Sequence, residues 1–115
     1  MRVLRKSHKE GSPLEFADVG NGLQALQTEV GGYIQVVSLH DVADGIMLIC
    51  NEDGHMLGLP YNFSLPWGDH VVGTVLFVRE DGEDGEEFSP VLDADSDKLC
   101  NVFGFTKREE QDEDK

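Results

Sequence analysis

Positive charge is what this sequence lacks over most of its length. No lysine or arginine occurs between residues 10 and 78 of the 115-residue chain, although that span holds nine carboxylates. The whole chain has 23 acidic and 9 basic residues, which gives a formal net charge of −14. Nucleic acid binding needs lysine and arginine side chains that displace counterions from phosphates. The composition therefore argues against direct nucleic acid binding and predicts a protein partner with a basic surface, which a negative field steers into contact.

Long apolar runs and cysteines are also scarce. No run approaches the roughly 20 apolar residues of a membrane span, and the first six residues lack the apolar core of a secretory signal. The two cysteines, Cys50 and Cys100, do not have the spacing of a metal site, and a disulfide would be unusual in the cytosol. We expect two buried thiols in a cytoplasmic protein that enters no membrane.

The length of the chain limits the number of domains. At 115 residues it can form one compact core and is too short for two ordinary domains. We expect a single domain over residues 1–105, followed by a disordered acidic tail over residues 106–115. Residues 80–87, which are acidic and interrupted by glycine, are expected to form a second solvated and mobile segment.

The main helix is predicted from Asn21 to Val30. Leu23, Leu26 and Val30 recur at the spacing of one helical face. Asn21 is a suitable cap for the first turn, because its side chain can accept from the exposed amides there. Gly31 is expected to end the helix, since glycine adopts the left-handed conformation without a side-chain clash.

Two short strands, 1–6 and 14–19, are predicted to form the first hairpin. Three basic residues in the first of them suit an edge position in the sheet more than a central one. A further strand is predicted over residues 33–39, which are apolar and rich in β-branched side chains.

The middle of the chain contains the strongest strand signals. Residues 46–50 are all apolar and predict a central strand, and residues 51–54 resemble a hairpin turn that returns the chain antiparallel over 55–59. Residues 71–78 predict the strongest strand, next to 46–50. Residues 60–68 contain two prolines and three aromatics, which favours an ordered loop packed over the core.

These elements predict an α+β fold: a mostly antiparallel sheet of about five strands with one main helix packed on one face. The alternative is a small, partly closed β-barrel. A last short helix is expected from Asp93, as its cap, to Val102. The residues expected to be buried together are Leu23, Leu26, Val30, Ile34, Val36, Leu48, Cys50, Val75 and Phe77.

No residue pattern identifies a catalytic group or a cofactor site. His40, His55 and His70 lie near carboxylates, but their spacing does not fix a metal site locally. Alternate aspartates from Asp93 match the start of a calcium loop, yet Lys98 stands where that loop needs glycine. We therefore predict a protein that is not an enzyme and that has no catalytic residue, no metal ligand and no cofactor.

The residues predicted to contact a partner come from two segments. One is the acidic segment 80–87, and the other is the aromatic segment 60–68. Aromatic loops in small domains are more often lids over the core than binding surfaces. The candidate partner-binding residues are Glu80, Asp81, Glu83, Asp84, Glu86, Glu87, Tyr61 and Trp67.

Four segments together resemble a known family: residues 23–34, 50–54, 58–62 and 73–78. Their Val-Gly-Gly-x-Ile and Leu-Pro-x-Asn motifs are similar to those of a small domain of unknown function found in phages, plasmids and other mobile elements. The similarity covers roughly residues 14–92. It implies no catalytic residue. It does imply a context among accessory genes, sometimes near antirestriction proteins, and a host-cell cytoplasmic location if the gene is phage-encoded.

Charge and resemblance together predict a non-enzymatic accessory protein that binds another protein. Its sharpest form is an inhibitor of a host-defence nuclease, because a carboxylate-rich surface can imitate the spaced charge of DNA. Acidity alone also fits a surface that is merely solvated. Two alternatives stay open: a plain interaction or structural module that uses the aromatic segment, and a small-ligand binder with a pocket beneath it. A homodimer is compatible with each.

Overall fold

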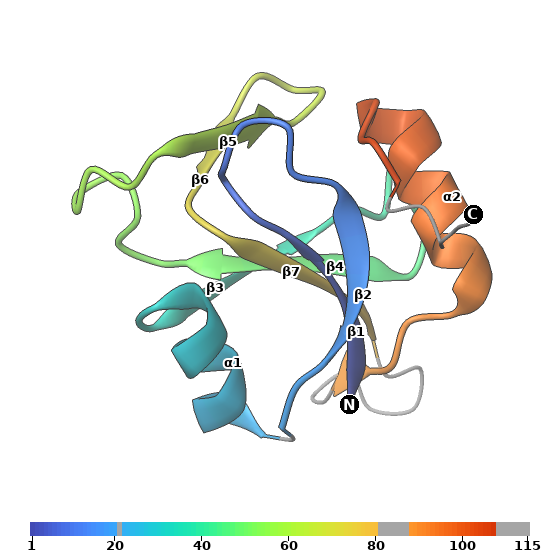
Figure 1. The fold of residues 1–115 in the computed structure, drawn as a ribbon, viewed down its shortest axis with the longest axis horizontal. Coiled ribbons are helices and arrows are strands. Elements are labelled where there is room, and N and C mark those ends of the chain that lie inside the picture. The colour runs from blue at the N-terminus through green and yellow to red at the C-terminus, as the bar shows by residue number, and fades with distance from the viewer. Residues whose placement is uncertain (21, 81–87, 108–115) are drawn as a thin grey trace, which may run out of the picture.

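The computed structural model describes residues 1–20, 22–80 and 88–107. Within these residues, two helices and eight strands follow one another (Figure 1). Their bounds are β1 (Arg2–Lys6), β2 (Leu14–Asp18), α1 (Leu23–Val30), β3 (Ile34–Ser38), β4 (Ile46–Asn51), β5 (Tyr61–Ser64), β6 (His70–Val72), β7 (Val75–Glu80), β8 (Phe88–Ser89) and α2 (Asp93–Phe103).

The main sheet has the order β2-β1-β7-β4-β3, with β8 paired to β7, and β5 and β6 form a separate two-stranded sheet. Every pairing between these strands is antiparallel. The predicted α+β class and the antiparallel sheet are therefore confirmed. The alternative of a partly closed barrel is not formed by the described residues, in which β2 and β3 end the sheet and do not pair with each other.

The basic residues of the first strand had suggested an edge position. This prediction is wrong, because β1 lies between β2 and β7. Two of its charged side chains, Arg5 and Lys6, donate to nearby carboxylates and to a backbone carbonyl. Arg5 donates to Glu29 Oε1 at 3.1 Å and to Glu15 Oε2 at 3.4 Å, and the Lys6 ammonium donates to the Ser7 carbonyl at 3.0 Å. Ion pairing across the sheet surface thus permits a central position.

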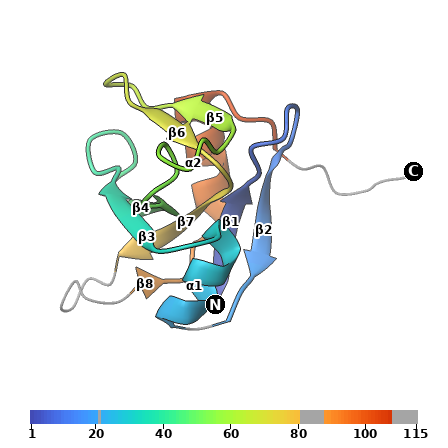
Figure 2. The ribbon, with the colours of Figure 1, turned by 90° about the vertical axis from the view of Figure 1, so that its left-hand side faces the viewer.

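The central strands β4 and β7 are buried on both faces. Leu48 and Phe77 point to one face and Ile49 and Leu76 to the other, and all four side chains are fully buried. Figures 1 and 2 show α1 on one side of the sheet, with α2 and the β5–β6 hairpin on the other. The sheet is therefore the middle layer between two apolar clusters.

The residues predicted to be buried together are in fact divided between these two clusters. Leu26, Val30 and Ile34 belong to the cluster under α1, whereas Leu48, Cys50, Val75 and Phe77 belong to the opposite one. Two of the predicted core residues are exposed, Leu23 at 57% and Val36 at 37%. Sequence periodicity had grouped the apolar residues without indicating that the sheet separates them.

Helix α1 begins later than predicted. Gly22 occupies the N-cap position without a side-chain hydrogen bond, and the proposed cap Asn21 lies outside the described residues. Leu26 and Val30 are buried, as predicted. Gly31 ends the helix with a φ of 84°, and its N–H donates to the Gln27 carbonyl at 2.8 Å. The predicted glycine stop is confirmed.

The prediction of a hairpin turn at residues 51–54 and a returning strand over 55–59 is wrong. Residues 52–58 form consecutive turns, in which Leu57 N–H donates to the Asp53 carbonyl at 2.8 Å and Leu59 N–H to the Gly54 carbonyl at 3.0 Å. Gly54 has no positive φ. It is needed for close packing instead, because a Cβ there would lie 2.8 Å from a methyl carbon of Val72. Strand β4 pairs with β3 and β7 and so has no free edge for a returning strand.

The next segment also differs from prediction. Part of the expected loop 60–68 forms β5, which pairs irregularly with β6 through a register shift between Tyr61 and Phe63. The long strand expected over residues 71–78 is divided into β6 and β7, because Gly73 between them has a φ of 76°. The expected neighbour of the second half is confirmed, since β7 pairs with β4.

The C-terminal helix α2 packs against the face of the sheet opposite α1. Leu99 is fully buried, and Phe103 and Phe105 pack around Phe63, with ring centroids 5.1 Å and 4.9 Å away. Val102, the last residue of the predicted helix, is 36% exposed. Neither helix of the described chain is long and apolar enough to cross a membrane.

The residues after α2 lie against β2. Leu14 N–H donates to the Thr106 carbonyl at 2.8 Å, and the Lys107 ammonium donates to Asp97 at 2.7 Å. The rest of the expected tail, residues 108–115, is outside the described residues. Residues 81–87 of the acidic segment are outside them too.

A buried ion pair joins α2 to β7. Arg79 donates two hydrogen bonds to the Asp95 carboxylate, at 2.8 Å and 2.9 Å, and Asp95 also accepts from the Leu92 N–H at 2.8 Å. Asp95, not the predicted Asp93, therefore accepts the hydrogen bond from the backbone N–H at the start of the helix. Burial pushes the pKa of Asp95 upward, but the hydrogen bonds from Arg79 and Leu92 more than offset it, so the pKa lies below the ordinary 3.8.

Asp95→Asn should lower the free energy of unfolding by about 3 kcal/mol, because Arg79 would lose its charged partner in a buried site. A depressed carboxyl pKa stabilises the fold above the ordinary value of 3.8, and that contribution is lost as the pH falls through the lower folded-state pKa. Urea denaturation at neutral pH and below pH 3.8 checks both effects. The gap between wild type and variant should shrink in acid, and a gap independent of pH would contradict the ion-pair explanation.

Candidate binding pocket

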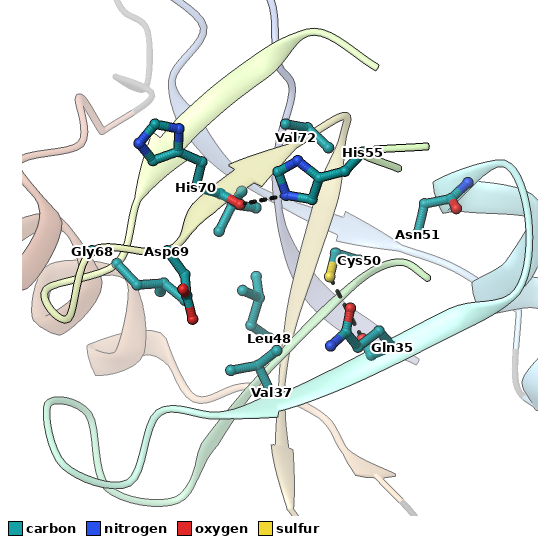
Figure 3. Close-up of a pocket in the computed structure, with 12 residues that line it drawn as sticks. Gln35, Val37, Leu48, Cys50, Asn51, His55, Gly68, Asp69, His70 and Val72 are labelled. Atoms are coloured by element: carbon teal, nitrogen blue, oxygen red, sulfur yellow. Dashed lines mark hydrogen bonds between the residues drawn. The ribbon is translucent and has the colours of Figure 1, made fainter. Parts of the chain in front are cut away.

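An open pocket of about 570 Å³ lies between the β3 end of the main sheet and the β5–β6 hairpin. Figure 3 shows Val37 and Gln35 on one side of the space and His55 and His70 on the other. The strands of the sheet, the turn after β4 and the hairpin all contribute. The lining residues are Gln35, Val37, Leu48, Cys50, Asn51, His55, Leu65, Gly68, Asp69, His70, Val71 and Val72.

The pocket has an apolar base and a polar rim. Leu48 is fully buried, and Leu65 and Val71 are 5% exposed, so the base belongs to the core that holds the hairpin on the sheet. At the rim, the Asp69 carboxylate accepts from the Trp67 indole N–H at 3.1 Å. Asp69 also closes the hairpin turn, because its carbonyl accepts from the Leu65 N–H at 2.8 Å.

Two histidines are placed at the hairpin side of the pocket. The His55 ring nitrogen Nε2 lies 2.9 Å from the His70 carbonyl oxygen, which ties the turn 52–58 to β6. The His70 ring meets Tyr61 edge to face, with centroids 5.5 Å apart. These contacts use the imidazoles to position the pocket wall, and within the described residues no group of three or more His, Cys, Asp or Glu side chains is placed to hold a metal ion.

The Cys50 thiol faces the pocket without an activating neighbour in the described chain. Its sulfur lies 3.8 Å from the Gln35 carbonyl, and burial raises the pKa of the thiol above the ordinary 9.0. A thiol with a raised pKa is protonated at neutral pH and is a poor nucleophile. Cys50 and Cys100 are both free, as predicted, but they are half-buried where we expected buried thiols.

The two motifs that suggested a family are structural joints beside the pocket. Asn51 Nδ2 donates to the Val30 carbonyl at 3.2 Å, at the end of α1, and Asn51 Oδ1 accepts from the Asp53 N–H at 2.7 Å. A Cβ at Gly32 would lie 2.9 Å from Asn51 Nδ2. The second glycine of Val-Gly-Gly-x-Ile is therefore required by close packing against this asparagine.

Asn62 of the Leu-Pro-x-Asn motif joins three segments. Its amide nitrogen donates to the Lys6 carbonyl at 3.0 Å and to the Gly73 carbonyl at 2.8 Å. These bonds connect β5 to the end of β1 and to the bend between β6 and β7. The motif thus anchors the hairpin that forms the outer wall of the pocket.

The predicted partner-binding residues lie in different places. Tyr61 and Trp67 are 56% and 47% exposed on the hairpin beside the pocket. Glu80 is exposed at the end of β7 away from this hairpin (Figure 1). Asp81, Glu83, Asp84, Glu86 and Glu87 lie outside the described residues.

From the sequence, His55 and His70 were candidates only for a metal site, and Gln35, Val37 and Asp69 were not predicted as pocket residues. No local pattern could have grouped these residues, since the pocket forms only when the hairpin folds over β3 and β4. Their one shared sequence feature is that they lie in the span without lysine or arginine.

The fold and pocket define a small α+β domain with an open cavity at one end of its sheet. The chain matches the family model described as Domain of unknown function (DUF3846) over residues 1–104, and it belongs to that family. No curated protein and no solved structure matches the chain. Membership in a family of unknown function agrees with the resemblance, whereas the association with phages and mobile elements stays a prediction.

Asn62→Asp should lower the free energy of unfolding by about 2–3 kcal/mol. A carboxylate oxygen would replace the amide nitrogen that donates to two carbonyls, and it would repel their oxygens. Asn62→Ala should cost less, since it leaves the carbonyls unpaired without adding a repelling charge. Thermal and urea unfolding of both variants measure the difference. If the two substitutions were equally mild, the role of Asn62 as a joint would be refuted.

Proposed function

We propose that this protein is a non-enzymatic binding protein whose partner is another protein with a basic surface. The observation that carries the proposal is the internal use of its arginines. Arg2 pairs with Asp93 at 2.7 Å, Arg5 pairs with two glutamates, and Arg79 pairs with Asp95 at 2.8 Å. In the described part of the chain, every arginine has a carboxylate partner within the fold.

The remaining charge is dominated by carboxylates. Lys6 is 9% exposed, so its ammonium contributes little to the positively charged surface. With a net charge of −14, the chain presents a negative field to its surroundings. Such a field accelerates encounters with basic proteins and disfavours nucleic acid.

The pocket face supplies the contact surface for this partner. Among the described residues, no lysine or arginine lines the pocket, and Asp69 places a carboxylate at its rim. Tyr61 and Trp67 stand beside it, and exposed aromatic side chains are frequent anchors of protein interfaces. The acidic segment 80–87 adds to the field that steers the partner.

In its finer form, the proposal is an accessory protein of a phage or mobile element that inhibits a host-defence nuclease. The support is chemical: a nuclease presents a basic groove to DNA, and a protein rich in carboxylates can occupy that groove. The family context implied by the Val-Gly-Gly-x-Ile and Leu-Pro-x-Asn motifs points in the same direction.

A second candidate function is the binding of a small molecule. The volume of about 570 Å³ supports it, because ligand pockets typically measure about 300–1,000 Å³. The apolar base and the polar rim of the pocket have the composition of such sites. A small cationic ligand would suit Asp69 for the same electrostatic reason as a basic side chain.

Affinity capture from host lysate tests the proposed function. Wild type should retain a basic protein at low ionic strength and lose most of it at high salt, because exposed charge pairs are screened. Changing the five carboxylates of residues 81–87 to their amides should weaken capture through the steering field. The matched control changes the five carboxylates of residues 108–115 in the same way.

Equal losses in the two neutralised variants indicate a general field, and a larger loss at 81–87 indicates direct contact by that segment. Capture that is insensitive to salt and to both sets of substitutions would contradict a charge-driven partner. Retention of small molecules alone, identified by mass spectrometry of the purified protein, would favour the second candidate.

A further inference from the structure

Strand β3 is a free edge of the main sheet. Among the described strands it pairs only with β4, along five consecutive positions from Ile34 to Ser38. The strand contains no charged residue and no proline, and its register shows no bulge. Gln35, Val36 and Ser38 are exposed. Such a regular uncharged edge is able to pair with another strand.

The direction of its unpaired backbone groups follows from the bonds at both ends of β3. Glu52 N–H donates to the Tyr33 carbonyl at 2.8 Å, and Leu39 N–H donates to the Ile46 carbonyl at 3.0 Å. Because hydrogen-bonded positions alternate along an antiparallel pair, the odd-numbered residues of β3 bond to β4. The N–H and C=O groups of Ile34, Val36 and Ser38 therefore point away from the sheet.

The opposite edge of the sheet is protected. On β2, Leu14 N–H donates outward to the Thr106 carbonyl at 2.8 Å, and Leu14 also forms a bridge with Lys107. Glu15 and Asp18 place charges along the same strand. Covering and charging an edge are the usual protections against strand pairing, and β3 has neither in the described structure.

The pocket lies on one face of this free edge. Gln35 and Val37 project from β3 into it, and Asp69 lies across the space on the hairpin (Figure 3). A strand added to β3 would direct every second side chain toward the pocket face. A long side chain there could rest its methylene groups on Val37 and bring its charged end to Asp69.

We propose that β3 is a strand-addition site for an extended segment of the basic partner, with a lysine or arginine of that segment in the pocket. This inference rests on the proposed function and specifies how the partner is recognised. Backbone bonds to Ile34, Val36 and Ser38 give affinity, and the pocket selects the positive side chain. The partner's intervening side chains lie on the α1 face, where Val36 is 37% exposed.

The probe is a fluorescent synthetic peptide of alternating valine and lysine, titrated into the full chain at low salt. Val36→Pro removes an outward N–H without breaking a bond to β4, and Val36→Thr is the matched control that keeps the N–H and the β-branched shape. Val36→Pro should weaken binding about tenfold or more, whereas Val36→Thr should bind within about twofold of wild type.

Asp69→Asn tests the pocket separately. It should weaken the valine–lysine peptide about fivefold while leaving circular dichroism and unfolding temperature near those of wild type. A valine–glutamate peptide should not bind, and a valine–lysine peptide with alternate N-methylated amides should bind poorly, because it cannot pair along the edge. If Val36→Pro fails to fold, Ser38→Pro against Ser38→Thr makes the same comparison at another outward N–H.

Three results would overturn the strand-addition site. Equal binding by Val36→Pro and Val36→Thr would place the basic segment elsewhere and leave the proposed function intact. A wild-type dimer in sedimentation that Val36→Pro converts to monomer would show that a second copy occupies β3. Absence of binding to every basic peptide, together with no salt-sensitive partner in lysate, would remove both the site and the proposed function.

Discussion

The pairing of β4 with β7 is the constraint on which the rest of the structure depends. Both strands are apolar on both faces, with Leu48 and Phe77 on one side and Ile49 and Leu76 on the other. Burial of each such side chain contributes about 1.5–3 kcal/mol, so neither face can be left in water. Helix α1 covers one face, and α2 with the β5–β6 hairpin covers the other. The pocket exists because this second cover is assembled from pieces that do not close over β3.

Polar side chains hold these covers in place. The Arg79–Asp95 pair fixes α2 to β7, Asn51 joins the end of α1 to β4, and Asn62 joins the hairpin to β1 and to the bend at Gly73. Each joint satisfies backbone or charged groups that would be costly to bury unpaired. The family motifs therefore have a structural explanation that does not depend on catalysis.

Charge and topology together shape what the surface can do. Each described arginine forms an ion pair with a carboxylate within the fold. The edge strand β3 has no charged residue, and the pocket lies beside it. In the proposed recognition, acidic charge would attract a basic partner over a long range, whereas the edge strand would recognise its backbone at short range. These two contributions to the proposed binding would act at different distances.

Local sequence patterns were sufficient for the helix before Gly31, the first hairpin and the central strand from Ile46. Each of these is specified by side-chain periodicity, or by a residue whose backbone preference acts within a few positions. The α+β class followed from their order. The excess of carboxylates was equally plain, since charge needs no fold to be counted.

Only the tertiary structure decided which elements lie side by side. The β1 strand is central despite its basic residues, since Arg5 pairs with Glu15 and Glu29 of other segments. Residues 52–58 form turns, and β4 is paired on both edges and has no room for a returning strand. Leu23 became exposed because α1 presents only Leu26 and Val30 to the sheet. The pocket likewise joins β3, β4 and the β5–β6 hairpin. These outcomes depend on contacts between residues distant in the chain, and local propensity carries no information about which distant surface will compete for a strand edge or an apolar face.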